Sequence, residues 1–372
     1  MNHIQQPRLM RRIAPFLSTG IAIAIAASAA IAAPEQIKAG GKTAAKTSGA
    51  PPDKDMQAVL DALASLKPKP IEKLSAVEAR KQPGPADAVK LVLKKQGKST
   101  DPATLVSGVT SVDRTVTGAA GELPARIYTP EGAGPFPVIV YYHGGGWVIA
   151  NKESYDGGAR GLAKEAQAVV VSIDYRQAPE HKFPASWDDS LAAYKWTLSN
   201  AASIKGDPKK IAVAGESAGG NLAVATAIAA RDGGLQAPVH VLAVYPIAQT
   251  STSTESYKEN AMAKPLNRVM MQWFIDKTVS SPKDTKDPRM QLTAAKLQGL
   301  PSVTVINAAI DPLRSDGAQL EDALKIAGVP VERKVYDGVT HEFFGMAAVV
   351  QKAKEAQSYA GQRLKQAFAT AK

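Results

Sequence analysis

The sequence predicts an α/β fold with a mostly parallel central sheet, helices on both faces and a small helical layer near its N-terminal side. Two observations support this prediction. From about residue 109 onward, segments with strand character alternate with segments of helical period over roughly 260 residues. Several of the strand segments are continuous apolar runs, as expected for strands that are buried on both faces of a parallel sheet.

The expected strands are short segments rich in β-branched and aromatic residues, at 123–129, 137–142, 168–174, 210–214, 239–245, 302–307 and 330–336. The expected helices of this body lie at 157–167, 188–200, 217–231, 315–327 and 347–369. Ligands of such folds bind beyond the carboxyl ends of the strands. Reactive residues at those ends are therefore the candidates for a functional site.

The first 32 residues have the parts of a secretory signal peptide. Three arginines within the first twelve residues precede an uncharged stretch over 13–33, and Ala30-Ile31-Ala32 fits a cleavage site. This pattern predicts an exported protein, periplasmic or secreted, with no stable membrane insertion after cleavage. An uncleaved membrane anchor is the alternative, because the uncharged stretch is barely long enough to span a bilayer.

Residues 33–54 are rich in Gly, Ala, Pro, Ser, Thr and Lys and are expected to form a flexible linker. Helical spacing of apolar residues begins at Met56, and further short helices are expected at 75–81 and 86–95. This helical layer is too small to fold alone, so it should lie on the larger body.

Composition excludes several classes of site. The chain has no cysteine, which removes disulfide scaffolds, thiolate metal sites and cysteine nucleophiles. Its five histidines leave few candidates for an imidazole base and argue against a histidine-rich metal site. The formal net charge is +11, but the basic residues are scattered rather than clustered, so no nucleic-acid partner is expected.

Ser217 is the candidate nucleophile. It lies in Gly215-Glu216-Ser217-Ala218-Gly219, between a buried strand and a helix. This is the G-x-S-x-G nucleophile elbow in its required structural context. The pentapeptide alone arises by chance in roughly one chain in ten of this length, so its position after a strand carries the argument.

A run of glycines supplies candidate oxyanion donors. His143-Gly144-Gly145-Gly146 follows directly on an apolar strand, and glycines expose backbone N–H groups that can stabilise a developing negative charge. A flexible hairpin turn is the alternative, whereas the patterns of phosphate-binding loops are not met. His143 itself is expected to hold the loop by hydrogen bonding.

A serine nucleophile needs a histidine as base and a carboxylate that orients the histidine. In folds with this nucleophile elbow, the three residues occur along the chain in the order Ser, Asp or Glu, His. His240 and His341 follow Ser217, and His341 is favoured because it lies in a loop after the last strand, whereas His240 lies inside an apolar strand. Asp311 follows a strand and is favoured as the acid. Asp316 is the alternative, although it fits the start of the next helix better.

Together these motifs resemble the hormone-sensitive-lipase-like (bacterial family IV) carboxylesterases of the α/β-hydrolase fold. The resemblance runs from about residue 55 to the C-terminus and rests on HGGGW, DYRQAPEHKFPA, GESAGGN, DPLRSDG and GVTHEF, which occur in that order. It implies a triad of Ser217, Asp311 and His341. It also implies an oxyanion hole formed by backbone N–H groups of Gly144, Gly145, Gly146 and Ala218.

The same resemblance implies a helical cap over residues 55–108, to which part of 247–290 contributes, and a catalytic domain over 109–372. The expected activity is hydrolysis of small short-acyl esters, with no metal or organic cofactor. A longer-chain lipase or another serine hydrolase is one alternative, although the cap sequence is polar and short. A non-catalytic binding protein, like the plant gibberellin receptors that lack the catalytic histidine, is another, but His341 is present here.

Two residues depart from the family pattern. Glu342 follows the candidate histidine where glycine is usual, and it should either raise the pKa of His341 or point to solvent. Glu216 precedes the serine where aspartate is commoner. Trp187, Trp273 and Phe274 are candidates for either the substrate pocket or the core.

Overall fold

The computed structural model describes Met1 and residues 51–371. The expected signal peptide and most of the expected linker lie outside the described residues. Within 51–371, the strands form a single sheet in the order β1-β2-β4-β3-β5-β6-β7-β8. Their bounds are β1 Val109–Gly118, β2 Gly121–Pro130, β3 Phe136–Tyr142, β4 Val169–Ile173, β5 Gly206–Glu216, β6 Val241–Val244, β7 Val303–Ile310 and β8 Val331–Thr340.

Strand β2 pairs antiparallel with β1 and β4, and the remaining neighbours pair parallel. The predicted mostly parallel α/β sheet is thereby confirmed. All seven expected strands are present, with ends shifted by a few residues, which is the usual uncertainty of element boundaries. The central strands β3 and β5 are buried toward their carboxyl ends, where Val138, Val140, Ile211 and Val213 are fully shielded from solvent.

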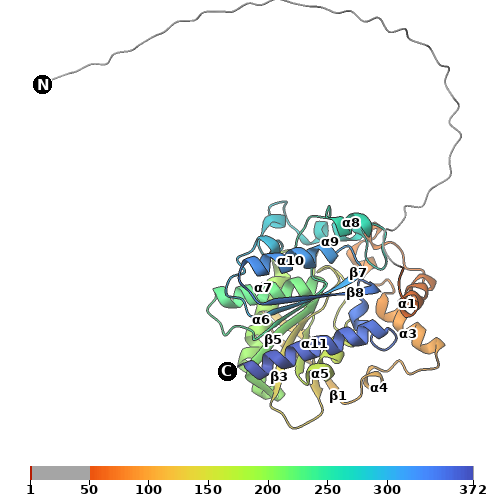
Figure 1. Cartoon of the computed structure of the whole chain (residues 1–372), viewed down its shortest axis with the longest axis horizontal. Coiled ribbons are helices and arrows are strands. Elements are labelled where there is room, and N and C mark those ends of the chain that lie inside the picture. Colours follow the sequence, from red (N-terminus) through yellow and green to blue (C-terminus); the bar gives the residue numbers. More distant parts are fainter. Residues whose placement is uncertain (2–50, 372) are drawn as a thin grey trace, which may run out of the picture. The chain divides into compact units, whose positions relative to one another are not determined.

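Helices cover both faces of the sheet (Figure 1). Side chains of α5 and α11 pack on one face, and side chains of α6, α7 and α10 pack on the other. The α-helix bounds are α1 Lys54–Ser65, α2 Ala76–Ala79, α3 Pro85–Lys95, α4 Pro102–Leu105, α5 Asp156–Ala166, α6 Ala185–Asn200, α7 Ala218–Asp232, α8 Glu255–Glu259, α9 Arg268–Thr278, α10 Arg314–Ile326 and α11 Gln351–Thr370. The 3-10 helices are η1 Ile71–Lys73, η2 Ala201–Ile204, η3 Asp284–Lys286, η4 Leu292–Ala294 and η5 Phe343–Met346.

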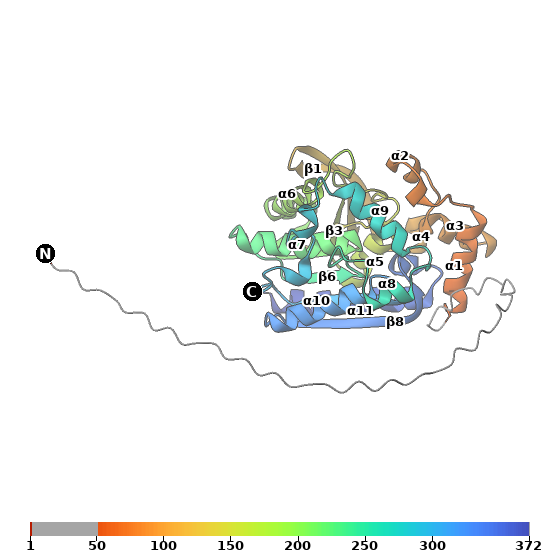
Figure 2. The same ribbon diagram turned by 90° about the horizontal axis from the view of Figure 1, so that it is seen from above.

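The first helices lie together at one end of this body, where Figure 2 draws them in orange. Helix α1 buries Met56, Val59 and Ala62 along one face, which is the i, i+3 spacing seen in the sequence. Its start is tied to the body, because the Asp53 N–H donates to the Gly338 carbonyl at 2.8 Å. Within residues 51–371, none of the helices is long and apolar enough to cross a bilayer.

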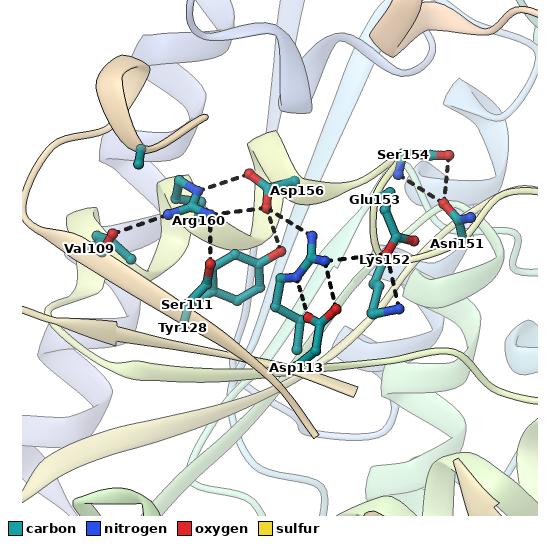
Figure 3. Close-up of polar contacts among 12 residues, drawn as sticks. Val109, Ser111, Asp113, Tyr128, Asn151, Lys152, Glu153, Ser154, Asp156 and Arg160 are labelled. Carbon is teal, nitrogen blue, oxygen red and sulfur yellow. Dashed lines mark hydrogen bonds and ion pairs between the residues drawn. The ribbon is translucent and has the colours of Figure 1, made fainter. Parts of the chain in front are cut away.

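Strand β1 was not among the expected strands, and its chemistry explains why. Most of its residues are exposed, so it shows no apolar alternation. It is held by its antiparallel partner β2 and by a buried polar cluster at the start of α5 (Figure 3). In that cluster, Arg160 donates to Asp156 at 2.9 Å, to the Val109 carbonyl at 3.1 Å and to Ser111 at 3.0 Å, and the Tyr128 hydroxyl donates to Asp156 at 2.9 Å.

Candidate active site

Ser217 lies in the sharp turn between β5 and α7, where it is the N-cap residue of the helix. Its φ of 57° and ψ of −116° are strained for a residue with a β-carbon. Two glycines make the turn possible. A β-carbon on Gly219 would overlap the Tyr142 carbonyl oxygen, and one on Gly215 would overlap the Gly219 carbonyl.

The structure brings Ser217 together with the two residues expected to act with it. His341 follows β8, and its Nε2 lies 3.0 Å from the Ser217 Oγ. Its Nδ1 lies 2.8 Å from Oδ2 of Asp311, which follows β7. Because a carboxylate only accepts, Nδ1 carries the hydrogen and Nε2 is left to accept the serine proton. All three side chains are almost fully buried.

Asp311 is held rigidly for this task. Its second oxygen, Oδ1, accepts the Leu313 N–H at 2.8 Å. Its backbone carbonyl accepts from the Asn260 side chain at 3.3 Å. The carboxylate is therefore oriented by contacts that do not involve the histidine, which fixes the imidazole tautomer and the direction of Nε2.

The glycine loop lies beside the serine. Gly145 and Gly146 line the same cavity as Ser217, and both have left-handed backbones, with φ of 90° and 60°. Ala218 is the first residue of α7, so its N–H has no acceptor inside the helix. Gly144 does not line the cavity; a β-carbon there would overlap the Tyr155 hydroxyl.

The other candidates have different surroundings. The ring of His240 forms hydrogen bonds inside the sheet, from Nδ1 to the Ser302 hydroxyl at 2.8 Å and from Nε2 to the Thr304 hydroxyl at 2.9 Å. Burial lowers the pKa of His240 to about 3. Asp316 accepts the Ala248 N–H at 3.0 Å, and burial raises its pKa to about 8. Neither is within hydrogen-bond reach of Ser217 or of the His341 ring in the described part of the chain.

His143 stacks on Tyr175, with ring centroids 4.4 Å apart and planes 12° apart. Its Nδ1 lies 2.8 Å from the carbonyl oxygen of Gly144, the next residue. Burial lowers the pKa of His143 below its ordinary value, against the opposing effect of Asp174. A neutral, packed ring inside the loop agrees with the expected role of holding the glycines.

A cavity of about 590 Å³ opens above Ser217 and His341. It is lined by cap residues and by residues of the 262–274 segment, so two separate stretches of chain form its walls. Of the three aromatic candidates for the pocket, Phe274 lines this cavity and the other two do not. The Trp187 indole N–H instead donates to Asn221 at 3.0 Å, and Trp273 packs against Phe274.

Glu342 points toward the reacting groups and not to open solvent. Its Oε1 lies 3.9 Å from His341 Nε2 and accepts the Tyr155 hydroxyl at 2.6 Å. Burial alone would lower the pKa of His341, but the charges of Asp311, Glu342 and Glu216 outweigh it and raise the pKa above its ordinary value. The pKa of Glu342 is itself raised, chiefly by burial.

Glu216 is enclosed behind the serine and accepts hydrogen bonds from the hydroxyls of Tyr141 and Tyr245. Burial and the nearby charge of Glu342 raise its pKa to about 8. The Tyr245 ring also packs on the His341 ring, with centroids 4.5 Å apart. The sequence analysis did not identify these tyrosines, because no motif or period marks them and their partners are distant in the chain.

Within residues 51–371, no group of three or more His, Asp or Glu side chains is arranged to hold a metal ion. The site therefore presents a serine, an imidazole, a carboxylate and free backbone donors at the carboxyl edge of a doubly wound sheet. This is the arrangement that defines serine hydrolases of the α/β-hydrolase class.

Comparison with known proteins gives the family. A family model described as alpha/beta hydrolase fold matches residues 139–345. Carboxylesterase NlhH of Mycobacterium tuberculosis is 40% identical over 291 residues, which cover 76% of this chain and 91% of that protein. Ethyl acetate hydrolase of Pseudomonas putida is 32% identical over 294 residues, which cover 77% of this chain and 88% of that protein.

Comparison with solved structures points to the same class of protein. The Pyrobaculum calidifontis esterase aligns with a TM-score of 0.73 at 35% identity, covering 82% of this chain and 96% of that one. The chain belongs to the hormone-sensitive-lipase-like esterase family of the α/β-hydrolase fold, and the resemblance drawn from its motifs is confirmed.

Proposed function

We propose that the chain is a serine carboxylesterase that hydrolyses small esters of short carboxylic acids through an acyl-enzyme. The observation that carries the proposal is the hydrogen-bonded series Asp311–His341–Ser217, with distances of 2.8 and 3.0 Å, below a largely apolar cavity. The names of the relatives, carboxylesterase and ethyl acetate hydrolase, support an ester as the substrate.

In the first half of the reaction, Ser217 Oγ attacks the ester carbonyl carbon and its proton passes to His341 Nε2. Asp311 stabilises the imidazolium that forms. The negative charge on the carbonyl oxygen is stabilised by N–H groups of the glycine loop and of Ala218, at the positive end of α7. His341 then gives its proton to the departing alcohol, and the acyl group remains on Ser217.

In the second half, water attacks the acyl carbonyl carbon and gives one proton to His341 Nε2. The same backbone donors stabilise the second tetrahedral intermediate. Ser217 Oγ leaves with the proton from Nε2, and the carboxylic acid is released. The chemistry needs no group beyond these side chains, the backbone donors and water.

A longer-chain esterase or lipase is the second candidate, and one feature of the cavity favours it. Leu60, Leu63 and Met270 line it with apolar surface. At its margin, the exposed side chains of Met262 and Val269, with exposed fractions of 71% and 55%, extend this apolar lining to the surface. The acyl-chain preference separates the two candidates.

The test is hydrolysis of p-nitrophenyl esters from acetate to laurate by the full chain. A kcat/KM that falls steeply beyond short acyl chains supports the short-acyl proposal. A maximum at long chains supports the lipase alternative. If the folded protein hydrolyses none of these esters, the short-acyl and the long-chain candidates are both contradicted, and a non-catalytic binding protein becomes the favoured function.

The pH dependence follows from the charges around His341. The base must be neutral to accept the Ser217 proton, and its pKa is raised. We therefore expect kcat/KM to be lost on the acid side with an apparent pKa above the ordinary histidine value of about 6.5. Because Glu342 contributes to the rise, Glu342→Gln should move this acid limb to lower pH.

The measurement is a kcat/KM profile from acid to mildly alkaline pH for the wild type and for Glu342→Gln. Glu72→Gln removes another carboxylate that lines the cavity and serves as the control. An acid limb that stays in place or moves to higher pH in Glu342→Gln would contradict the electrostatic assignment.

We also propose that the chain is exported and cleaved after Ala32. The support is the basic, apolar and small-residue pattern of residues 1–32. N-terminal sequencing of the protein recovered from the periplasm or the medium should begin at Ala33. Recovery of the intact N-terminus in the membrane fraction would favour the anchor instead.

A further inference from the structure

Glu342 is placed where the second half of the reaction occurs. Like Ser217 and His341, it lines the large cavity, and its Oε1 is 3.9 Å from Nε2. Its backbone has a φ of 70°, in the left-handed region that a glutamate adopts at a cost. The chain thus holds a carboxylate in a strained conformation beside the atom that accepts the proton of the attacking water.

We propose that the Glu342 carboxylate is a second catalytic acceptor for deacylation: it binds one hydrogen of the hydrolytic water while His341 takes the other. The inference rests on the proposed esterase function. It assigns Glu342 a task that Asp311 does not perform, because Asp311 contacts the opposite nitrogen of the ring.

The distance between the two acceptors suits a single water molecule. A water that forms two hydrogen bonds of about 2.8 Å to acceptors 3.9 Å apart has an angle of roughly 90° at its oxygen. That angle is close to the angle between the hydrogens of water, so both can be donated at once. A lone pair of the same oxygen is then free to face the acyl carbonyl carbon.

Tyr155 fixes the carboxylate for this role. Its hydroxyl donates to Glu342 Oε1 at 2.6 Å and also faces the α-carbon of Gly144. Tyr155 immediately precedes α5, whose first turn is anchored by the buried Asp156–Arg160 pair drawn in Figure 3. Tyr155 is thus a positioning residue that links Glu342 to a rigid part of the fold.

A second, smaller cavity also borders Glu342. It has a volume of about 120 Å³, and it is lined by Tyr155, Glu216 and Glu342. Glu342 borders both cavities, whereas Ser217 borders only the larger one.

The atoms of the step balance as follows. The water oxygen forms a bond to the acyl carbon, one of its protons moves to His341 Nε2, and the other stays on oxygen, hydrogen-bonded to Glu342. The bond between the acyl carbon and Ser217 Oγ then breaks, and Oγ takes the proton from Nε2. Glu342 finishes the cycle unchanged and gains or loses no proton.

Methanol discriminates this role from a general effect on His341. Water has two hydrogens to donate, whereas methanol has one, which must go to His341 Nε2 when methanol attacks the acyl-enzyme. Loss of the Glu342 acceptor should therefore slow hydrolysis but not methanolysis. Any change in the pKa of His341 affects both reactions of the same acyl-enzyme alike and cancels from their ratio.

The experiment measures methyl butyrate and butyrate formed from p-nitrophenyl butyrate at a fixed methanol concentration. For Glu342→Gly, we expect the ratio of methanolysis to hydrolysis to rise at least about tenfold, since a hydrogen bond to a charged group is lost. Glu342→Gln keeps an oxygen acceptor and should show a smaller rise. Tyr155→Phe should fall between the wild type and Glu342→Gly.

The controls separate the possible failures. Glycine suits a φ of 70°, and this gain offsets the lost hydrogen bond from Tyr155, so Glu342→Gly should stay folded with a Tm near that of the wild type. Glu122→Gln, at an exposed carboxylate on β2 outside both cavities, should leave the ratio unchanged. An unchanged ratio in a folded Glu342→Gly would overturn the inference, as would equal slowing of both reactions. Absence of any acyl-enzyme turnover in the wild type would instead contradict the esterase proposal.

Discussion

Replacement of Ser217 by alanine is expected to lower kcat for ester hydrolysis about 10⁶-fold. In the proposed mechanism the serine oxygen attacks the ester and carries the acyl group, so its removal eliminates the acyl-enzyme route. The fold should survive, because alanine keeps the β-carbon that the left-handed turn already accommodates. The measurement is steady-state hydrolysis of p-nitrophenyl acetate beside a thermal melt of each variant.

The triad should behave as a unit in this experiment. His341→Ala is expected to cost about as much as Ser217→Ala, and the double variant no more than either, because each single loss already abolishes the route. His181→Ala, at an exposed histidine, is the matched control and should keep its activity. A double variant with a loss equal to the product of the two single losses would show that the residues act separately.

The parts of the site that the sequence predicts are those with strict local backbone requirements. Gly215 and Gly219 flank Ser217 because a β-carbon at either position would overlap a backbone carbonyl oxygen. Gly145 and Gly146 have left-handed backbones that favour glycine. Requirements of this kind leave fixed residue types at fixed spacing, so the motif can be found without knowledge of the fold.

The parts that could not be predicted depend on partners distant in the chain. Tyr155 and Glu342 are separated by 187 positions, and no period or motif links them. The polar strand β1 is stabilised by pairing with β2 and by Arg160, and not by an apolar face of its own. The cavity likewise depends on how the cap packs against the 262–274 segment, which one-dimensional spacing does not specify.

Glu342 could be predicted from the sequence only in part. Its departure from the family pattern is visible in the sequence, but two outcomes were open, a raised histidine pKa or a solvent-facing side chain. The structure selects the first, because the carboxylate lies 3.9 Å from Nε2 and is held by the Tyr155 hydroxyl. The consequence for deacylation needs both distances and could not be inferred from sequence.

Substitution of Gly219 by alanine is expected to cost about 3 kcal/mol or more of unfolding free energy, which for a folded body of this size corresponds to a Tm lower by roughly 4 °C or more. The added β-carbon would overlap the Tyr142 carbonyl oxygen and lie 2.7 Å from that of His143. Both are backbone atoms where β3 enters the glycine loop, so relief of the overlap must move the proposed oxyanion donors relative to Ser217. We therefore expect kcat to fall at least about 10²-fold in the folded fraction. Gly84→Ala is the matched control, because no atom lies within 4 Å of its added β-carbon; it changes only the N-cap of α3, so the free energy of unfolding should fall by about 1 kcal/mol or less. A Gly219→Ala protein with the Tm and kcat of the wild type would show that the elbow and the glycine loop are not in the contact described here.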